Sequence, residues 1–264
     1  MKLNNKVVWI TGASSGIGEA LAYELAKRNC QLVISARRQS ELERVKVQTG
    51  LSDENILVLP LDLAEHGQLI GKANKVLNKF NKLDCIIHNG GISQRSLAVH
   101  TSFDVDKQLM SVNYLGAVAL TKAVLPFFQK QQSGHFVVMS SLAGKFGTKL
   151  RSAYCASKHA LHGFFESLRC ENWDKNIGIT IVCGGFINTN VSINAMTGDG
   201  SKHDKQDETH RQGISPQKCA IQIINAVEKN KEEIYVGGKE ILAIYAKRFF
   251  PKWFSNKMKK LEVN

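Results

Sequence analysis

Short apolar runs alternate with longer segments of mixed polarity along almost the whole chain. Seven of these runs are short, and several are rich in β-branched residues and nearly continuous in apolar character, which is typical of strands buried on both faces. Strands are expected at residues 7–11, 31–35, 56–59, 83–88, 134–140, 178–183 and 233–236. The segments between them have helical patterns, and helices are expected at 18–28, 40–48, 65–80, 103–131, 152–175 and 216–229.

This alternation of strand and helix predicts the fold class. It indicates an α/β fold with a single doubly wound parallel sheet of about seven strands, of Rossmann type, and helices on both faces. No internal repeat and no linker rich in Gly, Pro or Ser interrupts the pattern, so one domain over residues 1–264 is expected. No apolar run reaches about 18 residues, and a membrane-spanning helix is therefore not expected. The N-terminal residues have no apolar signal segment, which makes the cytoplasm the expected compartment.

Two segments depart from the alternation. Residues 188–213 are polar and weakly periodic, and they follow a strand at the carboxyl edge of the sheet, where long loops often act as lids. A disordered insertion is the alternative. Residues 238–264 form a basic tail with many large apolar side chains, and Pro251 is expected to divide it into two helical pieces. Such a tail can pack on a subunit, cover a site or contact a membrane surface, and packing is favoured because most amphipathic helices bury their apolar face.

The charge is strongly positive but unevenly placed. The formal net charge is +12, from 35 Lys and Arg against 23 Asp and Glu. Residues 239–264 hold seven basic residues against two acidic ones, and the remaining excess is spread thinly over the rest of the chain. The body has no basic stripe interleaved with aromatic residues, so a nucleic-acid partner is not expected.

The six cysteines are scattered, with no C-x-x-C and no Cys/His cluster in the sequence. This pattern argues against both a disulfide scaffold and a structural zinc site. His159, His162 and Glu166 fall near one helical face, but their spacing is unspecific, and ordinary packing is favoured over a metal site. Cys155 is expected to be a small buried side chain, with a redox-sensitive thiol as the alternative.

A glycine-rich turn follows the first predicted strand and opens the first predicted helix. It reads TGASSGIG at 11–18, with the spacing G-x-x-x-G-x-G. Glycines let the backbone approach a pyrophosphate closely, and a helix N-terminus offers free N–H groups and a positive dipole end. The position between strand and helix, inside a βαβ unit, makes a dinucleotide site the favoured interpretation.

The end of the second predicted strand indicates which dinucleotide. The cofactor's adenosine ribose is expected there, and an acidic residue at this point would favour NAD(H). The chain instead has Arg37 and Arg38, whose guanidinium groups suit a 2′-phosphate. We therefore expect NADP(H), with two solvated arginines as the alternative. Asp62, after the third strand, is expected either to accept a hydrogen bond from the adenine or to cap the next helix.

Tyr154 and Lys158 stand four residues apart and would share one face of a helix. Such a pair has little weight alone, because it arises often by chance. Here it follows the glycine turn and Ser141, which lies at the end of the fifth predicted strand. Strand ends and adjoining helix starts converge on one crevice in a doubly wound sheet.

With these pieces in order, the chain resembles the short-chain dehydrogenase/reductase family over almost its whole length. The matching segments are TGASSGIG at 11–18, Asp62 with Leu63, HNGG at 88–91, Asn113, Ser141, Tyr154 with Lys158, and GFINT at 185–189. The segments SSLAGK at 140–145 and YCASKHAL at 154–161 resemble most the branch that contains 11β-hydroxysteroid dehydrogenase and related membrane-associated reductases.

The resemblance implies an oxidoreductase that interconverts a carbonyl and an alcohol. Tyr154 would act as general acid or base, and the charge of Lys158 would stabilise its phenolate. Ser141 would bind the substrate oxygen, and Asn113 would hold a water that links Lys158 to solvent. A homodimer or homotetramer through the helices at 103–131 and 152–175 is also implied.

The resemblance also implies the cofactor contacts. The expected cofactor-binding residues are Gly12, Ser14, Gly16, Ile17, Gly18, Arg37, Arg38, Asp62, Leu63, Asn89, Tyr154, Lys158, Ile187 and Thr189. Two positions depart from the family pattern: HNGG stands where Asn-Asn-Ala-Gly is usual, and Gly184 stands where Pro is usual. Loss of that proline loosens the loop that leads to the lid-like segment.

The substrate is expected to be a hydrophobic ketone or aldehyde, lipid-like or steroid-like. The apolar residues around the lid-like segment suggest such a pocket: Phe146, Phe186, Val191, Ile193 and Met196. Reduction of a 3-oxoacyl group on an acidic carrier protein is the alternative within the same class, because a basic surface would steer such a partner. An NADP(H)-binding sensor or membrane-surface protein without turnover is the alternative from another class.

Overall fold

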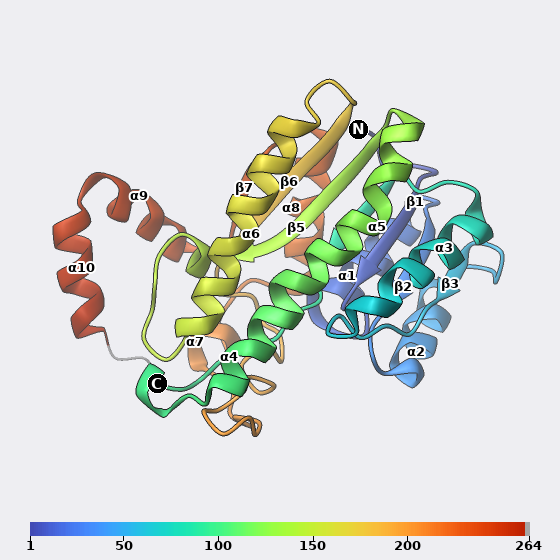
Figure 1. The fold of residues 1–264 in the computed structure, drawn as a ribbon. Coiled ribbons are helices and arrows are strands. Elements are labelled where there is room, and N and C mark those ends of the chain that lie inside the picture. The colour runs from blue at the N-terminus through green and yellow to red at the C-terminus, as the bar shows by residue number, and fades with distance from the viewer. Residues whose placement is uncertain (262–264) are drawn as a thin grey trace.

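The computed structural model describes residues 1–261 and contains one parallel sheet of seven strands (Figure 1). The strands are β1 (Val7–Thr11), β2 (Gln31–Ser35), β3 (Ile56–Val58), β4 (Cys85–His88), β5 (Gly134–Ser141), β6 (Ile177–Gly184) and β7 (Glu233–Val236). Their order is β3-β2-β1-β4-β5-β6-β7, and all six pairings are parallel. The order reverses between β1 and β4, which places a crevice at the carboxyl ends of these strands. The doubly wound fold predicted from the sequence is confirmed.

Helices cover both faces of the sheet. They are α1 (Gly16–Ala26), α2 (Gln39–Thr49), α3 (Leu69–Phe80), α4 (Phe103–Met110), α5 (Gly116–Gln131), α6 (Ser152–Glu171), α7 (Glu208–Arg211), α8 (Pro216–Glu228), α9 (Leu242–Phe249) and α10 (Pro251–Lys260). One apolar core lies between the sheet and α3, α5 and α6, and the other lies between the sheet and α1, α2 and α8. Figure 1 shows α5 and α6 crossing one face of the sheet while α1 and α8 lie behind it.

The predicted elements are all present, but several boundaries differ. The segment predicted as one helix over 65–80 begins with a short 3-10 turn, His66–Gln68, before α3. The helix predicted to end at 175 ends earlier, at Glu171 in α6. Short strands and fraying helix ends carry weak local signals, so boundaries are the least reliable feature of a pattern.

The helix predicted over 103–131 is continuous but not uniform. Between α4 and α5 the stretch Ser111–Leu115 has π-helical bonding. The whole stretch Phe103–Gln131 is long and apolar enough, by length and composition, to span a membrane, with a mean hydropathy of 1.3 over its most apolar window. This differs from the expectation that the chain has no such segment. Leu120, Val124 and Phe128 are fully buried in the core against the sheet, as in a core helix.

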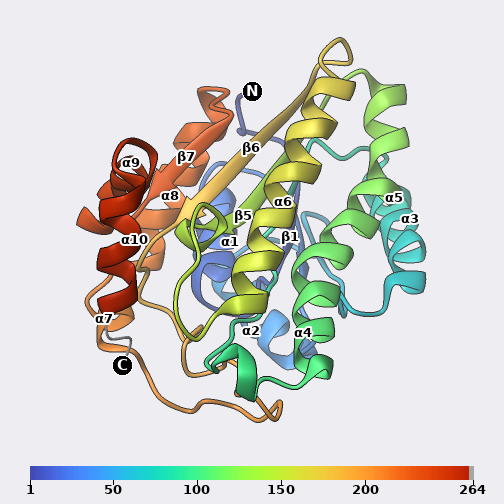
Figure 2. The same ribbon diagram turned by 60° about the vertical axis from the view of Figure 1, so that its left-hand side comes forward.

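The lid-like segment and the tail lie next to the carboxyl edge of the sheet. Residues 188–213 form mostly turns, with the short α7 near their end. The tail folds into α9 and α10, and Pro251 begins α10 where the sequence predicts a break. Figure 2 shows these two helices together beside β7, at one side of the molecule. Residues 262–264 of the predicted tail lie outside the residues that the structure describes.

Candidate active site

The glycine turn after β1 is held in place by the loop after β4. Gly12 has φ +66°, in the left-handed region that favours glycine. The side-chain amide of Asn89 donates hydrogen bonds to the carbonyl oxygens of Thr11 (3.0 Å) and Gly12 (3.1 Å). The Thr11 hydroxyl in turn accepts the backbone N–H groups of Asn89 and Gly90, both at 3.0 Å. Asn89 therefore braces the turn as well as lining the crevice beside it.

Close approach explains why these two loops carry glycine. A Cβ atom on Gly12 would lie 2.7 Å from the Cα of Gly90. A Cβ atom on Gly18 would lie 2.2 Å from the carbonyl oxygen of Gly12. At Gly90, where the family usually has alanine, a Cβ atom would lie 2.7 Å from the Leu63 side chain. Glycine at position 90, in place of the usual alanine, therefore lets the Leu63 side chain lie closer to this loop.

One cavity of about 550 Å³ runs along this turn. The predicted cofactor-binding residues that line it are Gly12, Ser14, Gly16, Ile17, Arg37, Arg38, Asp62, Leu63, Asn89 and Thr189. Of the remaining predicted cofactor residues, Ile187, Tyr154 and Lys158 line a neighbouring cavity, and Gly18 lies in the contact between helix and turn. Ile17, Asn89 and Thr189 line both cavities, so the two adjoin.

The turn has the properties that a dinucleotide phosphate requires. Ser15, the N-cap residue of α1, makes no side-chain cap hydrogen bond, so the first amides of the helix keep their donors for a ligand. Arg37 and Arg38 are exposed beside the cavity, and neither forms an ion pair among the described residues. The Asp62 carboxylate lines the cavity and also accepts the backbone N–H of Ala64 at 2.9 Å. The residues present therefore fit a dinucleotide.

The predicted catalytic residues Ser141, Tyr154 and Lys158 line the second cavity, which measures about 320 Å³. Ser141 ends β5; its hydroxyl accepts the N–H of Ala143 at 3.1 Å and donates to the Gly184 carbonyl oxygen at 3.3 Å. Tyr154 and Lys158 lie one turn apart on α6, with the Lys158 ammonium 5.8 Å from the centre of the Tyr154 ring. The structure thus brings Ser141, at the end of β5, to the same cavity as Tyr154 and Lys158 on α6.

Burial changes the acidity of two of these groups. Burial raises the pKa of the Tyr154 phenol, while the Arg151 guanidinium and the Ser141 hydroxyl oppose this effect. Burial also lowers the pKa of Lys158 to about 8. The Lys158 ammonium donates one hydrogen bond, to the Met139 carbonyl oxygen at 2.7 Å. The Lys158 ammonium therefore loses its proton closer to neutral pH than an exposed lysine does.

Asn113 lies in the π-helical stretch, a kind of irregularity that is frequent at functional sites. Its amide group is largely engaged: Oδ1 accepts the Ile92 N–H at 2.8 Å, and Nδ2 donates to the Ile92 carbonyl oxygen and the Ser157 hydroxyl. A Cβ atom on Gly91 would lie 3.0 Å from Asn113 Oδ1 and 3.6 Å from Lys158 Nζ. A water between Asn113 and Lys158 would therefore have to use the Asn113 backbone carbonyl or the remaining lone pair of Oδ1.

Gln94 positions Tyr154 and was not identified from the sequence. Its side-chain oxygen accepts the backbone N–H groups of Ala153 (3.0 Å) and Tyr154 (3.3 Å), which caps the first turn of α6. The Gln94 side chain is fully buried. Its cap partner lies 59 residues away in the chain, and no local pattern signals such a contact.

The walls of the second cavity come from the loops after β5 and β6, the lid-like segment and the tail. Phe146, Phe186 and Val191 line it as predicted, whereas Ile193 and Met196 do not. Met196 instead packs against the small cluster of Val105, Leu109 and Ala153. The tail contributes Ala243, Met258 and Leu261, and the polar side chains in the wall include Arg151, His210 and Glu240. The tail therefore forms part of the candidate substrate pocket.

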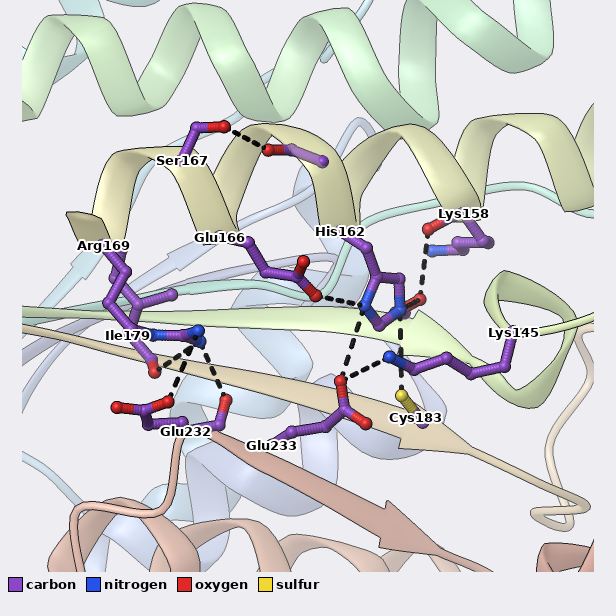
Figure 3. A network of polar contacts seen from close by, with 12 residues as sticks. Lys145, Lys158, His162, Glu166, Ser167, Arg169, Ile179, Cys183, Glu232 and Glu233 are labelled. Atoms are coloured by element: carbon purple, nitrogen blue, oxygen red, sulfur yellow. Dashed lines mark hydrogen bonds and ion pairs between the residues drawn. The ribbon is translucent and has the colours of Figure 1, made fainter. Parts of the chain in front are cut away.

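A polar network lies behind the cavity, around His162 on α6 (Figure 3). His162 Nε2 lies 2.9 Å from the Ser140 hydroxyl, and Nδ1 lies 3.6 Å from the Glu233 carboxylate. His162, Cys183 and Glu233 place their possible metal-ligand atoms within 4.8 Å of one another. The set considered from the sequence is a different one, His159, His162 and Glu166. The Glu233 carboxylate already pairs with Lys145 at 2.6 Å. The His159 ring lies 2.8 Å from the Cys155 carbonyl oxygen, along its own helix.

Comparison with known proteins identifies similar chains. Residues 6–199 match the family described as short chain dehydrogenase. The Drosophila melanogaster "Dehydrogenase/reductase SDR family protein 7-like" is 44% identical over 258 residues, which is 96% of this chain and 79% of the relative. The Homo sapiens "Dehydrogenase/reductase SDR family member 7" is 40% identical over 273 residues, 99% of this chain and 80% of the relative.

The fold is also similar to solved structures. A short-chain dehydrogenase/reductase from Burkholderia phymatum in complex with NAD superposes with a TM-score of 0.84 at 20% identity, covering 94% of each chain. Levodione reductase superposes with a TM-score of 0.81 at 22% identity, covering 91% of this chain and 99% of that one. At these identities the likeness concerns the fold.

Proposed function

The chain belongs to the short-chain dehydrogenase family, and from that premise we propose that it is an NADP(H)-dependent oxidoreductase that reduces a hydrophobic ketone or aldehyde to the alcohol. One observation carries the proposal. Ser141, Tyr154 and Lys158 surround one mainly apolar cavity that adjoins the cavity along the glycine turn. A carbonyl beside Ser141, Tyr154 and Lys158 can therefore meet a nicotinamide whose dinucleotide lies in the cavity along the glycine turn.

Each residue has a role in the proposed reaction. The bound nicotinamide supplies the hydride. Tyr154 donates a proton to the carbonyl oxygen, and the Lys158 charge stabilises the phenolate that remains. The Ser141 hydroxyl binds the same oxygen as negative charge develops on it. The apolar wall of Phe146, Phe186 and Val191 excludes water from the reacting carbonyl.

Preference for NADP(H) is part of the proposal. Arg37 and Arg38 lie beside the cavity where the adenosine ribose is expected, and their guanidinium groups suit a 2′-phosphate. The cavity wall also includes Lys202, which adds a third positive charge along the cavity. The position of both arginines in the cavity lining favours phosphate binding over the alternative of two merely solvated side chains.

The test is oxidation of NADPH, followed by absorbance, with a panel of apolar ketones and aldehydes. The Tyr154→Phe variant loses only the proton donor and is expected to reduce kcat by about two or more orders of magnitude while still binding the cofactor. The matched control is Tyr114→Phe, because Tyr114 packs against Phe164 outside the cavity. Full activity in Tyr154→Phe would exclude the proposed role.

Two other functions are distinguished by the same assay. A 3-oxoacyl-carrier-protein reductase would act on an acyl group carried by an acidic protein and prefer it over the free ketone, with a strong dependence on salt. A non-catalytic sensor would bind NADP(H) without turnover. The intact set of Ser141, Tyr154 and Lys158 favours an enzyme, because a pure binding protein needs no aligned proton donor.

We also propose that the protein is cytoplasmic and that its tail contacts a membrane surface without crossing the bilayer. The tail exposes Leu242, Phe249, Phe250 and Trp253 by 66%, 70%, 66% and 57%. Its other face packs on the body, where Phe254 is buried against Phe146 at 5.1 Å between ring centres. An apolar face flanked by lysines suits an anionic lipid surface. The proposed dimer or tetramer would form through residues 103–131 and 152–175.

A further inference from the structure

Two buried arginines share one carboxylate beside the candidate active site. Arg95 pairs with Asp207, and their side chains are only 2% and 5% exposed. Arg151 reaches the same carboxylate at 3.4 Å, from the residue directly before α6. Asp207 belongs to the lid-like segment, so this cluster fastens that segment to the body. Its formal charges are two positive and one negative.

The surplus charge belongs to Arg151. Arg95 uses two nitrogens on Asp207 and donates a third hydrogen bond to the Gln94 carbonyl oxygen at 2.9 Å. Arg151 has one long contact to Asp207, and its Nε atom is buried without a hydrogen-bond partner. A buried charge that is only partly paired destabilises the folded protein. A ligand that supplied a negative charge here would relieve part of that destabilisation.

Among the described residues, no acidic side chain other than Asp207 forms an ion pair with Arg151. Glu240, which lines the same cavity, already accepts the backbone N–H groups of Phe186 and Gly238. Glu208 lies on the exposed surface and pairs with Arg211 at 3.4 Å. The His210 ring contacts the Ile187 carbonyl oxygen, and burial lowers its pKa to about 4, so it stays neutral at neutral pH. Beside Lys158 and Glu240, the mainly apolar cavity therefore holds one under-paired cation, Arg151, close to Tyr154.

We propose that Arg151 selects the substrate by binding an anionic group, a carboxylate or a phosphate monoester, that the ketone carries near its carbonyl. The rest of the substrate is an apolar chain that lies against the tail and Phe146. This inference rests on the proposed function, because it names the class of ketone that the same site reduces. The planar guanidinium of Arg151 would donate a charge-assisted hydrogen bond to the anion.

The test compares matched pairs of ketones. A γ-oxo carboxylic acid of medium chain length is compared with its methyl ester, and the phosphate ester of a hydroxyketone with the free hydroxyketone. The charged member is expected to have a kcat/KM about tenfold to a hundredfold higher, the range for a charge-assisted hydrogen bond. The pair with the larger ratio identifies which anion the site prefers.

Variants connect this preference to Arg151. Arg151→Gln is expected to abolish it, and Arg151→Lys to retain part of it. Arg211→Gln removes an exposed arginine outside the cavity and is expected to leave the ratio unchanged. Cofactor fluorescence verifies that each variant is folded. Equal kcat/KM for the charged and neutral ketones in the wild type would overturn the inference. A loss in Arg151→Gln that is equal for both members would also overturn it, because the charge would then serve Tyr154.

A binding measurement separates this inference from the proposed function. Calorimetry compares a saturated fatty carboxylate with the corresponding alcohol on the NADP⁺-saturated protein. If no ketone is reduced but the carboxylate binds more tightly and Arg151→Gln removes the difference, the proposed reaction is wrong and the anion site is supported. If ketones are reduced but the carboxylate binds no more tightly than the alcohol, the anion site is refuted and the reaction stands.

Discussion

The carboxylate of Glu240 accepts a hydrogen bond from the backbone N–H of Phe186 at 2.8 Å, and this contact joins the tail to the loop after β6. The same oxygen accepts the N–H of Gly238 at 2.9 Å. A Cβ atom on Gly185 would lie 2.3 Å from this oxygen, and one on Gly237 would lie 2.4 Å from it. The glycines therefore leave the space in which one carboxylate holds two segments together.

Replacing Glu240 by alanine should loosen both segments. The loss of a charged acceptor for two N–H groups should destabilise this region by about 1.5–3 kcal/mol. We expect faster proteolysis after residue 238 and weaker cofactor binding, because Ile187 and Thr189 lie in the same loop. Limited proteolysis and cofactor fluorescence measure the two effects. Glu240→Gln keeps an acceptor oxygen and should resemble the wild type more closely; identical behaviour of Glu240→Ala and wild type would contradict the role.

Cofactor preference should depend on Arg37 and Arg38. The double change to alanine removes the two guanidinium groups beside the expected 2′-phosphate. We expect NADPH affinity to fall about tenfold to a hundredfold, with little change for NADH. Titration with nicotinamide fluorescence gives both constants. Arg248→Ala, in the tail, is the matched control. Equal affinity for both cofactors in the wild type would instead indicate an NAD-linked enzyme.

The rate of reduction should fall with rising pH as Lys158 loses its proton. Burial lowers the pKa of Lys158 to about 8, and the ammonium form is the one that stabilises the Tyr154 phenolate. Burial raises the pKa of Tyr154, so the phenol stays protonated in this range. We therefore expect kcat/KM for ketone reduction to be level below about pH 7 and to decrease through pH 8. Lys158→Arg should move the decrease to higher pH; an unchanged profile in that variant would assign it to another group.

Acid should destabilise the fold partly through His88. Burial lowers the pKa of His88 to about 3, whereas the unfolded chain takes up a proton near pH 6.5. Between these values the unfolded state binds more protons, so the free energy of unfolding decreases as pH falls below about 6.5. At pH 5 the loss is about 2 kcal/mol. His88→Asn places the usual family residue there and should reduce the drop in Tm between pH 7.5 and pH 5. An equal drop in both proteins would show that other groups dominate.

The tail should bind anionic vesicles through its exposed aromatic side chains. Phe249→Ser with Trp253→Ser removes two of them, and we expect binding to phosphatidylserine vesicles to weaken at least tenfold. Phe103→Ser with Trp173→Ser is the matched control, because those side chains are 75% and 82% exposed outside the tail. Vesicle flotation measures the binding. Binding that is unaffected by the tail variant, or that does not depend on anionic lipid, would refute membrane contact by the tail.

The sequence predicts the strands and the fold of this molecule because strong local patterns specify them. Apolar runs, such as the one at β1, and glycine turns, such as Gly12 to Gly18, are signals within a few neighbouring residues. They locate the strands, and the rule that strand ends converge then brings Ser141 near Tyr154. The resemblance of residues 140–145 and 154–161 to the 11β-hydroxysteroid dehydrogenase branch stays a prediction.

Contacts between distant residues could not be predicted in this way. Gln94 caps α6 across 59 residues, and Arg95 meets Asp207 across 112 residues. Neither pairing leaves a periodic signal, because a polar residue in a loop looks the same whether it is solvated or buried. The misplacement of Met196 has the same cause: its position in the lid-like segment suggests the pocket, but tertiary packing turns it toward Val105 and Leu109.

The brace between Asn89 and the glycine turn also affects how the cofactor associates. The turn is already fixed by four hydrogen bonds that Asn89 and Gly90 of the neighbouring loop donate to Thr11 and Gly12. Fixing the backbone of one free residue costs about 1–2 kcal/mol, and here that cost is met during folding. The dinucleotide thus meets a preorganised surface, and little conformational entropy remains to be lost on binding.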